Sequence, residues 1–302
     1  MKESFDIILG QKGVVQYFDL FSDDNINNIK TNIITEESFF GCIKINENIF
    51  ALTSNSIFPN GQDMLSFYNV KTKKLSNRIE GYSFVLSPNG LAIIQREEKI
   101  EEKVEKKKKK KKKNKGNENG GIKMSRILLC ACKKYCNNQK NGILLVNAEL
   151  SNNKNIKEPF YDTDSFEIHC ICPLLKVENA NENYENIDEK YKSNIKITDT
   201  EYFLVGGFDV EIGEGKIKLY KLIFNEELAD SKIEYLQDIE FEENENFEYF
   251  ETPINCIIQS KISGNVLISC YNEKTYLLTP PNLEFYEQDE YLDINPNKIS
   301  LN

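Results

Sequence analysis

The segment Glu201–Phe241 has the sequence EYFLVGGFDVEIGEGKIKLYKLIFNEELADSKIEYLQDIEF, and it indicates the fold most clearly. It begins with an apolar run that ends in paired glycines, turns, and continues as a run in which apolar and polar residues alternate. A polar loop follows, and then a second alternating run over Lys232–Phe241. Alternation with a period of two is typical of β-strands, and glycines among polar residues are typical of the turns between them. The segment therefore predicts three antiparallel strands in succession.

Weaker copies of this pattern recur along the chain in units of about four strands. The element that aligns best is the alternating third strand, which occurs at Val14–Leu20, Met64–Val70, Gly142–Val146, Lys216–Lys221 and Lys274–Thr279. Four-stranded units repeated every ~40–60 residues are typical of a β-propeller. We therefore expect an all-β fold, a β-propeller with about five recognisable four-stranded blades. A β-sandwich or another all-β fold, or a mixed α/β fold, remains an alternative.

The expected domain comprises residues 1–95 and 124–287, interrupted by insertions. Arg96–Lys123 holds 13 basic and 6 acidic residues, including eight consecutive lysines, so it predicts a disordered insertion because like charges repel and little can be buried. Residues 178–194 predict a polar loop insertion, and 288–302 a polar tail. The whole chain has a net charge of −10, so its remainder carries −17, which argues against a general nucleic-acid-binding surface.

Targeting signals are not evident in the sequence. No run of about 18 apolar residues occurs, so we expect no transmembrane segment. The N-terminal residues MKESFDIILGQKG do not resemble a secretory signal, and no Asn-x-Ser/Thr sequon is present. We expect a cytoplasmic protein, with the nucleus as the alternative, in which the eight cysteines stay reduced.

Three segments carry a resemblance to a known superfamily. Ser87-Pro88-Asn89-Gly90 before Leu91–Gln95 resembles the Ser-Pro-Asp-Gly turn between the first and second strands of a blade. Phe203–Phe208 followed by Gly215–Tyr220 is similar to the second and third strands, and Val266–Leu278 repeats this more loosely. The chain thus resembles the WD40-like β-propeller superfamily, although it lacks the Gly-His and Trp-Asp dipeptides of good repeats and has no Trp. The resemblance implies an interaction protein rather than an enzyme.

The first blade is expected to be incomplete, because Met1 stands just before its second strand. The tail offers no obvious strand to complete it. The expected ring therefore closes imperfectly, uses the tail irregularly, or forms the end of a longer propeller.

Cysteines and the single histidine were considered as metal ligands or catalytic groups. Cys130-x-Cys132 and His169-Cys170-x-Cys172 lack the spacing of a zinc knuckle, and cysteines two apart on a strand share one face. We interpret these cysteines as buried hydrophobes. His169 has no nucleophile beside it in sequence, so we interpret it as a packed or rim residue, and we expect no catalytic, metal or cofactor site.

Two further patterns favour turns over binding sites. Gly213-Glu214-Gly215-Lys216 lacks the spacing and the helix of a phosphate-binding loop, so it predicts a hairpin. Asp209, Glu211 and Glu214 offer too few oxygen ligands for a calcium loop and predict a solvated acidic turn.

The strongest charge signals suggest electrostatic or partner contacts. The lysine tract is either a solvated spacer or a tether to RNA, an acidic protein or anionic lipid, or a nuclear-import tract, and it comprises Lys106, Lys107, Lys108, Lys109, Lys110, Lys111, Lys112 and Lys113. Exposed aromatics among acidic residues suit partner contact. The candidate partner-binding residues, whose aromatics could instead pack back on the blade edge, are Phe247, Tyr249, Phe250, Glu243, Glu245 and Glu248.

Together these features predict a non-enzymatic scaffold that binds unidentified protein partners through blade loops and faces. The alternative is an electrostatically anchored adaptor whose lysine tract binds nucleic acid or anionic membrane. An enzyme built on a propeller is the third hypothesis, and it would have to rely on carboxylates for acid–base chemistry.

Overall fold

The structure is a computed structural model of the 302-residue chain. It describes residues 5–9, 14–19, 30–33, 38–55, 64–69, 71–72, 74–79, 81–85, 88–99, 122–134, 139–148, 159–178, 196–225, 228–239, 242–243, 246–247, 252–261, 263–272 and 275–278.

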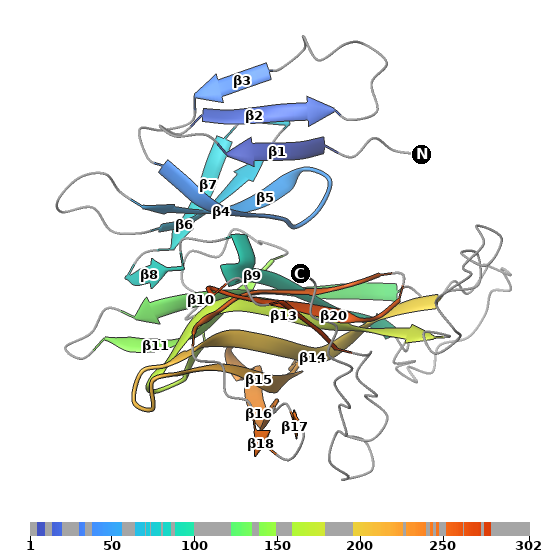
Figure 1. Cartoon of the computed structure of the whole chain (residues 1–302). Helices are drawn as coiled ribbons and strands as arrows, with labels where there is room; N and C mark the ends of the chain where they lie inside the picture. The colour runs from blue at the N-terminus through green and yellow to red at the C-terminus, as the bar shows by residue number, and fades with distance from the viewer. Residues whose placement is uncertain are drawn as a thin grey trace, which may run out of the picture.

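Within these residues the strands form five larger antiparallel sheets and one two-stranded ribbon (Figure 1). Sheet 1 contains β1 (Phe5–Leu9), β2 (Val14–Asp19) and β3 (Lys30–Ile33). Sheet 2 contains β4 (Ser38–Lys44), β5 (Ile49–Asn55), β6 (Met64–Asn69) and β7 (Lys74–Ile79). Sheet 3 contains β8 (Tyr82–Phe84), β9 (Leu91–Lys99), β10 (Ile122–Lys134), β11 (Lys140–Asn147) and β12 (Phe160–Asp162). The sheets follow one another along the chain, as the sequence predicted.

The second half of the chain continues this arrangement. Sheet 4 contains β13 (Phe166–Glu178), β14 (Lys196–Asp209), β15 (Glu214–Ile223) and β16 (Lys232–Asp238). The ribbon pairs β17 (Glu242–Glu243) with β18 (Asn246–Phe247). Sheet 5 contains β19 (Ile254–Gln259), β20 (Val266–Cys270) and β21 (Thr275–Leu278). The all-β class is confirmed, and so are successive antiparallel sheets, of which sheets 2 and 4 have the predicted four strands. The three strands predicted in the opening segment are the last three of sheet 4.

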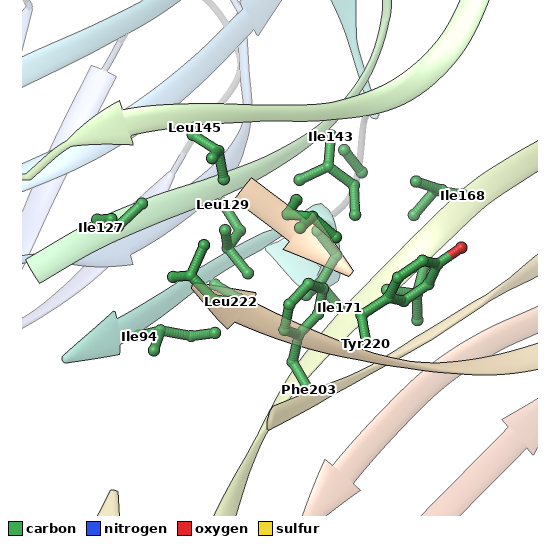
Figure 2. Close-up of a cluster of buried hydrophobic side chains, with 14 of the residues drawn as sticks. Ile94, Ile127, Leu129, Ile143, Leu145, Ile168, Ile171, Phe203, Tyr220 and Leu222 are labelled. Carbon is green, nitrogen blue, oxygen red and sulfur yellow. The ribbon is translucent and has the colours of Figure 1, made fainter. Parts of the chain in front are cut away.

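Buried side chains join sheets 2 to 5 in a series, each packed face to face on the next. Figure 2 shows the cluster between sheets 3 and 4, with Phe203 and Tyr220 of sheet 4 among the labelled members. Such a series does not fit the two layers of a β-sandwich. The core clusters of the described residues run linearly from sheet 2 to sheet 5, so the closed propeller ring stays a proposal.

Burial on both faces explains the uninterrupted apolar runs of the inner strands. In β14, Tyr202 and Leu204 face sheet 5, whereas Phe203 and Val205 face sheet 3. Cysteines follow the same rule. The four cysteines considered above are buried as free thiols, namely Cys130, Cys132, Cys170 and Cys172. Each cysteine pair lies in one core cluster, so their interpretation as core residues is confirmed.

The turn Ser87–Gly90 was predicted to join two neighbouring strands of a blade, and this prediction is wrong. β8 and β9 do not pair with each other; both run antiparallel to β10, with Phe84 opposite Cys132 and Leu91 opposite Cys130. β8 and β9 thus occupy the same strand position beside β10, one after the other. The connection between them is tight, because a Cβ on Gly90 would lie 2.9 Å from Val85 Cβ. The connection therefore interrupts one edge strand of sheet 3 and does not lead to a new neighbouring strand.

Strand pairing also continues into both ends of the predicted insertion Arg96–Lys123. β9 extends to Lys99 and β10 begins at Ile122, and these two residues are paired. Residues 100–121, 179–195 and 279–302 lie outside the described residues.

Candidate functional site

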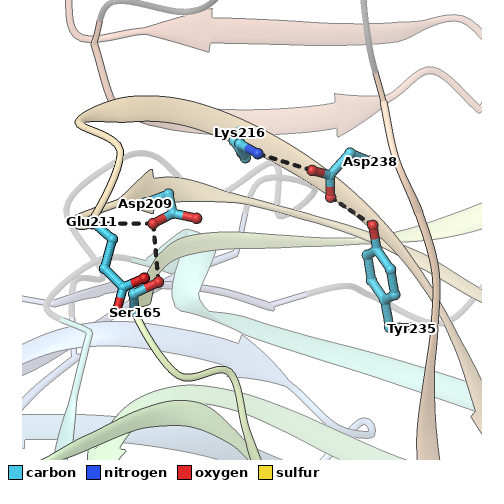
Figure 3. A network of polar contacts seen from close by, with 6 residues as sticks. All are labelled: Ser165, Asp209, Glu211, Lys216, Tyr235 and Asp238. Carbon is cyan, nitrogen blue, oxygen red and sulfur yellow. Dashed lines mark hydrogen bonds and ion pairs between the residues drawn. The ribbon is translucent and has the colours of Figure 1, made fainter.

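Two neighbouring turns form a rigid edge, which we call the hairpin rim and define as Asp162–Ser165 and Asp209–Glu214. The first turn joins β12 to β13, and the second joins β14 to β15. Asp209 Oδ1 accepts hydrogen bonds from the Ser165 hydroxyl (3.0 Å) and from the Glu211 amide (3.2 Å) (Figure 3). The Val210 amide donates to the Ser165 carbonyl oxygen (3.2 Å). The two turns are therefore bonded to each other through side chains and backbone.

Each turn is also closed within itself. The Gly213 amide donates to the Asp209 carbonyl oxygen (2.9 Å), and Gly213 has a φ of +76°, which glycine adopts without steric cost. In the first turn, the Asp164 amide donates to Asp162 Oδ1 (3.0 Å), and Asn141 Nδ2 donates to the Asp164 carbonyl oxygen (3.1 Å). Asp and Asn are favoured in turns because their side chains form such local hydrogen bonds. The predicted hairpin and acidic turn are confirmed.

Apolar side chains project from the second turn. Val210 is 55% exposed and Ile212 is 52% exposed, although both are large β-branched hydrophobic residues. A turn normally carries polar residues at such positions. Two exposed aliphatic side chains on a hydrogen-bonded turn are therefore a feature that local folding does not require.

Two nearby carboxylates are paired with lysines. Lys140 forms an ion pair with Asp162 of the first turn, and Lys216 of β15 forms one with Asp238 at the end of β16 (3.1 Å). The hydrogen bond from Lys140 lowers the pKa of Asp162. Burial lowers the pKa of Lys216, but its hydrogen bond to Asp238 and nearby carboxylates outweigh that effect, so the pKa is raised.

Asp164 and Glu211 are both exposed, and neither forms an ion pair with a lysine or arginine of the described ranges. Both residues adjoin the contact between the two turns, because the Val210 amide, next to Glu211, is hydrogen-bonded to Ser165, which follows Asp164. The rim thus combines exposed aliphatic surface with negative charge that internal lysines do not neutralise.

Aromatic residues support the rim from the gap between sheets 3 and 4. Lys218 Nζ lies 4.7 Å from the ring centre of Phe166 and 5.6 Å from that of Tyr235. Tyr235 donates a hydrogen bond from its hydroxyl to Asp238 (2.9 Å), as Figure 3 shows, and its ring meets Tyr220 edge-on. Cation–π contacts of this kind hold the lysine in place and stiffen the outer part of sheet 4.

His169 occupies a β-bulge near the start of β13. It lies between Ile168 and Cys170, where the register with β14 shifts, and its ring meets that of Tyr271 edge-on at 6.0 Å. Burial lowers the pKa of His169. The nearest described charges belong to Glu167 and Lys133, which pair with each other. These contacts fit the packed residue that was one of the two predicted placements of His169.

Of the other predicted site residues, the structure describes Glu243 and Phe247. Glu243 and Phe247 belong to the paired ribbon β17–β18, whereas Glu245, Glu248, Tyr249 and Phe250 lie outside the described residues. The lysine tract Lys106–Lys113 also lies outside them. The sequence analysis missed Val210 and Ile212, whose signal was two β-branched residues placed inside a turn.

No group of three or more His, Cys, Asp and Glu side chains in the described part of the chain is placed to hold a metal ion. No helix there is both long and apolar enough to span a bilayer.

Fold and rim together define, over the described residues, an all-β protein of successive antiparallel sheets of three to five strands and a hydrogen-bonded pair of neighbouring turns. No protein-family model matches the chain, and no curated protein matches it. Among solved structures it is similar to U3-55K, with 8% sequence identity, over 88% of this chain and 85% of that chain, at a TM-score of 0.25.

Proposed function

We propose that the protein is a non-enzymatic scaffold that binds other proteins through the hairpin turns of a WD40-like β-propeller. The observation that supports this function is the hairpin rim, where Val210 and Ile212 are half exposed on a turn fixed by hydrogen bonds. Exposed aliphatic side chains on a fixed backbone suit protein association, because little conformational entropy is lost on binding. Core residues of sheets 3 to 5 hold this turn in position.

Affinity purification of the tagged full-length protein, followed by quantitative mass spectrometry, tests the proposal. We expect a reproducible set of proteins whose recovery does not depend on an added substrate or cofactor. Turnover of a small molecule by the purified protein, with no reproducible protein partner, would contradict a scaffold.

A second candidate is an electrostatic adaptor that uses the lysine tract Lys106–Lys113. Its observation is the strand pairing that flanks the tract, where β9 pairs with β10 as far as Lys99 and Ile122 and would hold both ends of residues 100–121 together. Arg96 of β9 also forms an ion pair with Glu201 (3.4 Å), which ties it to sheet 4. β10 runs from Ile122 toward Lys133, and Lys133 contacts Glu167, which is close in sequence to Ser165 of the hairpin rim. The ends of β9 and β10 that flank residues 100–121 therefore lie at the opposite end of these strands from the rim.

Replacement of residues 100–121 by a short turn tests the adaptor. If the tract tethers the protein, the change abolishes salt-sensitive recovery of RNA or of anionic vesicles, because phosphate contacts release counterions. Protein partners that bind the hairpin rim would be retained. Equal recovery of RNA and vesicles with and without the tract would exclude the adaptor.

A further inference from the structure

We infer that the hairpin rim docks a basic, apolar segment of a partner protein, one that places aliphatic or aromatic side chains beside lysine or arginine. This inference rests on the scaffold function proposed above and names the chemistry of the partner. It concerns Val210 and Ile212 as the apolar contact and Glu211 and Asp164 as the charged contacts.

The apolar part of the partner follows from exposure. Val210 and Ile212 leave about half of their surface in water, and removing apolar surface from water contributes about 25 cal/mol per Å². They are two residues apart on one turn, so a single partner surface can cover both. A purely polar segment would gain nothing from this pair.

The basic part follows from the carboxylates that such a partner must cover. Glu211 stands between the two aliphatic residues in sequence, and Asp164 lies on the adjoining turn. A neutral apolar partner would take these carboxylates out of water without a counter-charge, which is costly. An acidic partner, or an anionic membrane, would be repelled. Lysine or arginine side chains at the edge of the contact would supply the counter-charge.

The lysines already at the rim do not meet this need. Lys140 is paired with Asp162, and Lys216 is paired with Asp238. These lysines therefore do not neutralise Glu211 and Asp164, and the geometry points to a partner that supplies the positive charge.

Binding of four labelled peptides to the full-length protein, measured by fluorescence anisotropy, tests the inference. The peptides share one length and combine Lys with Leu, Lys with Ser, Glu with Leu, or Glu with Ser. We expect the Lys/Leu peptide to bind at least about tenfold more tightly than the other three. Its binding should weaken between about 0.1 and about 1 M salt, where the Debye length falls from about 10 to 3 Å.

Variants assign the binding to the rim. V210S/I212S should weaken binding of the Lys/Leu peptide about tenfold or more, whereas I258S should leave it unchanged, since Ile258 is equally exposed (55%) on β19. E211Q keeps the turn and its side-chain volume, so it provides a second variant that removes only the charge. We expect it to weaken binding severalfold and to reduce the salt dependence.

The inference is overturned if V210S/I212S binds the Lys/Leu peptide as well as the unchanged protein does, if the Lys/Ser or Glu/Leu peptide binds equally, or if no peptide binds. Preferential binding of the unchanged rim to anionic vesicles would also overturn it. Affinity purification with V210S/I212S separates this failure from failure of the scaffold. If the variant keeps every partner of the unchanged protein, the scaffold stands and the rim is not its docking site.

Discussion

At Gly206, side chains of sheet 5 pack against the backbone of sheet 4, and the substitution Gly206→Ala tests that contact. A Cβ on Gly206 would lie 2.6 Å from Ile254 Cγ2, 2.7 Å from Cys170 Sγ and 2.9 Å from Ile257 Cδ1. Cβ atoms in folded proteins essentially never come this close to other heavy atoms. Ile254 and Cys170 are fully buried, so neither can move aside into solvent. The added methyl group must therefore displace sheet 5.

The expected loss is about 1–2 kcal/mol of unfolding free energy. Overpacking a filled core costs about 1–3 kcal/mol. The lower chain entropy of alanine in the unfolded state offsets about 0.4–1 kcal/mol of this. Urea denaturation followed by far-ultraviolet circular dichroism measures the change, because the chain has no Trp to serve as a fluorescence probe. We expect a lower midpoint at an unchanged slope.

A double-mutant cycle with Ile254→Ala identifies the clash. Ile254→Ala removes the nearest methyl group, so the two substitutions together should cost less than their sum, with a coupling of about 0.5–3 kcal/mol. Gly213→Ala is the control, since no atom lies within 4 Å of its added Cβ and its cost comes only from the positive φ. Additive costs for Gly206→Ala and Ile254→Ala, or a Gly206→Ala protein as stable as the original, would refute the packing of sheet 5 on sheet 4.

Three further outcomes are expected. Burial lowers the pKa of His169, the only histidine, so as the pH falls the unfolded chain binds a proton before the folded protein does. The unfolding free energy should therefore fall as the pH falls below about 6.5. His169→Gln should remove this pH dependence when denaturation is measured at several pH values. Ile257→Ala should cost about 2–5 kcal/mol and its exposed neighbour Ile258→Ala less than about 0.5 kcal/mol; similar losses would contradict the facing of β19. Replacing residues 100–121 by an Asn-Gly turn should leave the protein folded. The shorter loop costs less entropy to close, so the unfolding free energy should rise by at most roughly 2 kcal/mol. A lower unfolding free energy would show instead that the segment packs on the fold.

The hairpins were predictable because short-range chemistry specifies them. Asp209 and Gly213 supply the side-chain acceptor and the positive φ that close the turn after β14, and both can be recognised in the sequence. The burial of Cys130 and Cys132 was predictable for a similar reason, since alternation places both on one face of a strand.

The arrangement of β8 and β9 was not predictable because it depends on β10, which follows residues 100–121. The local sequence around Asn89 favours a turn whether the next strand pairs with β8 or continues along the same neighbour. Only the register against β10, with Phe84 opposite Cys132 and Leu91 opposite Cys130, distinguishes these possibilities.

The apolar part of the candidate site was missed for a different reason. Val210 and Ile212 alternate with acidic residues inside the predicted turn, and the local sequence does not specify whether their side chains pack on the sheets or face solvent. Their exposure depends on the hydrogen bonds of Asp209, which end β14 just before them. The contact between the two turns also depends on Ser165, which is distant in sequence.

The stiffness of the rim follows from the burial of the strand that leads to it. β14 is packed on both faces through Phe203 and Leu204, so its end at Asp209 cannot shift without disturbing two cores. The turn after it is then fixed by hydrogen bonds to Ser165. Ordering a free loop would cost about 1–2 kcal/mol for each residue fixed, and this cost would be subtracted from the binding free energy. On the rim this entropy cost is met during folding, so the proposed partner would need only a modest apolar contact at Val210 and Ile212.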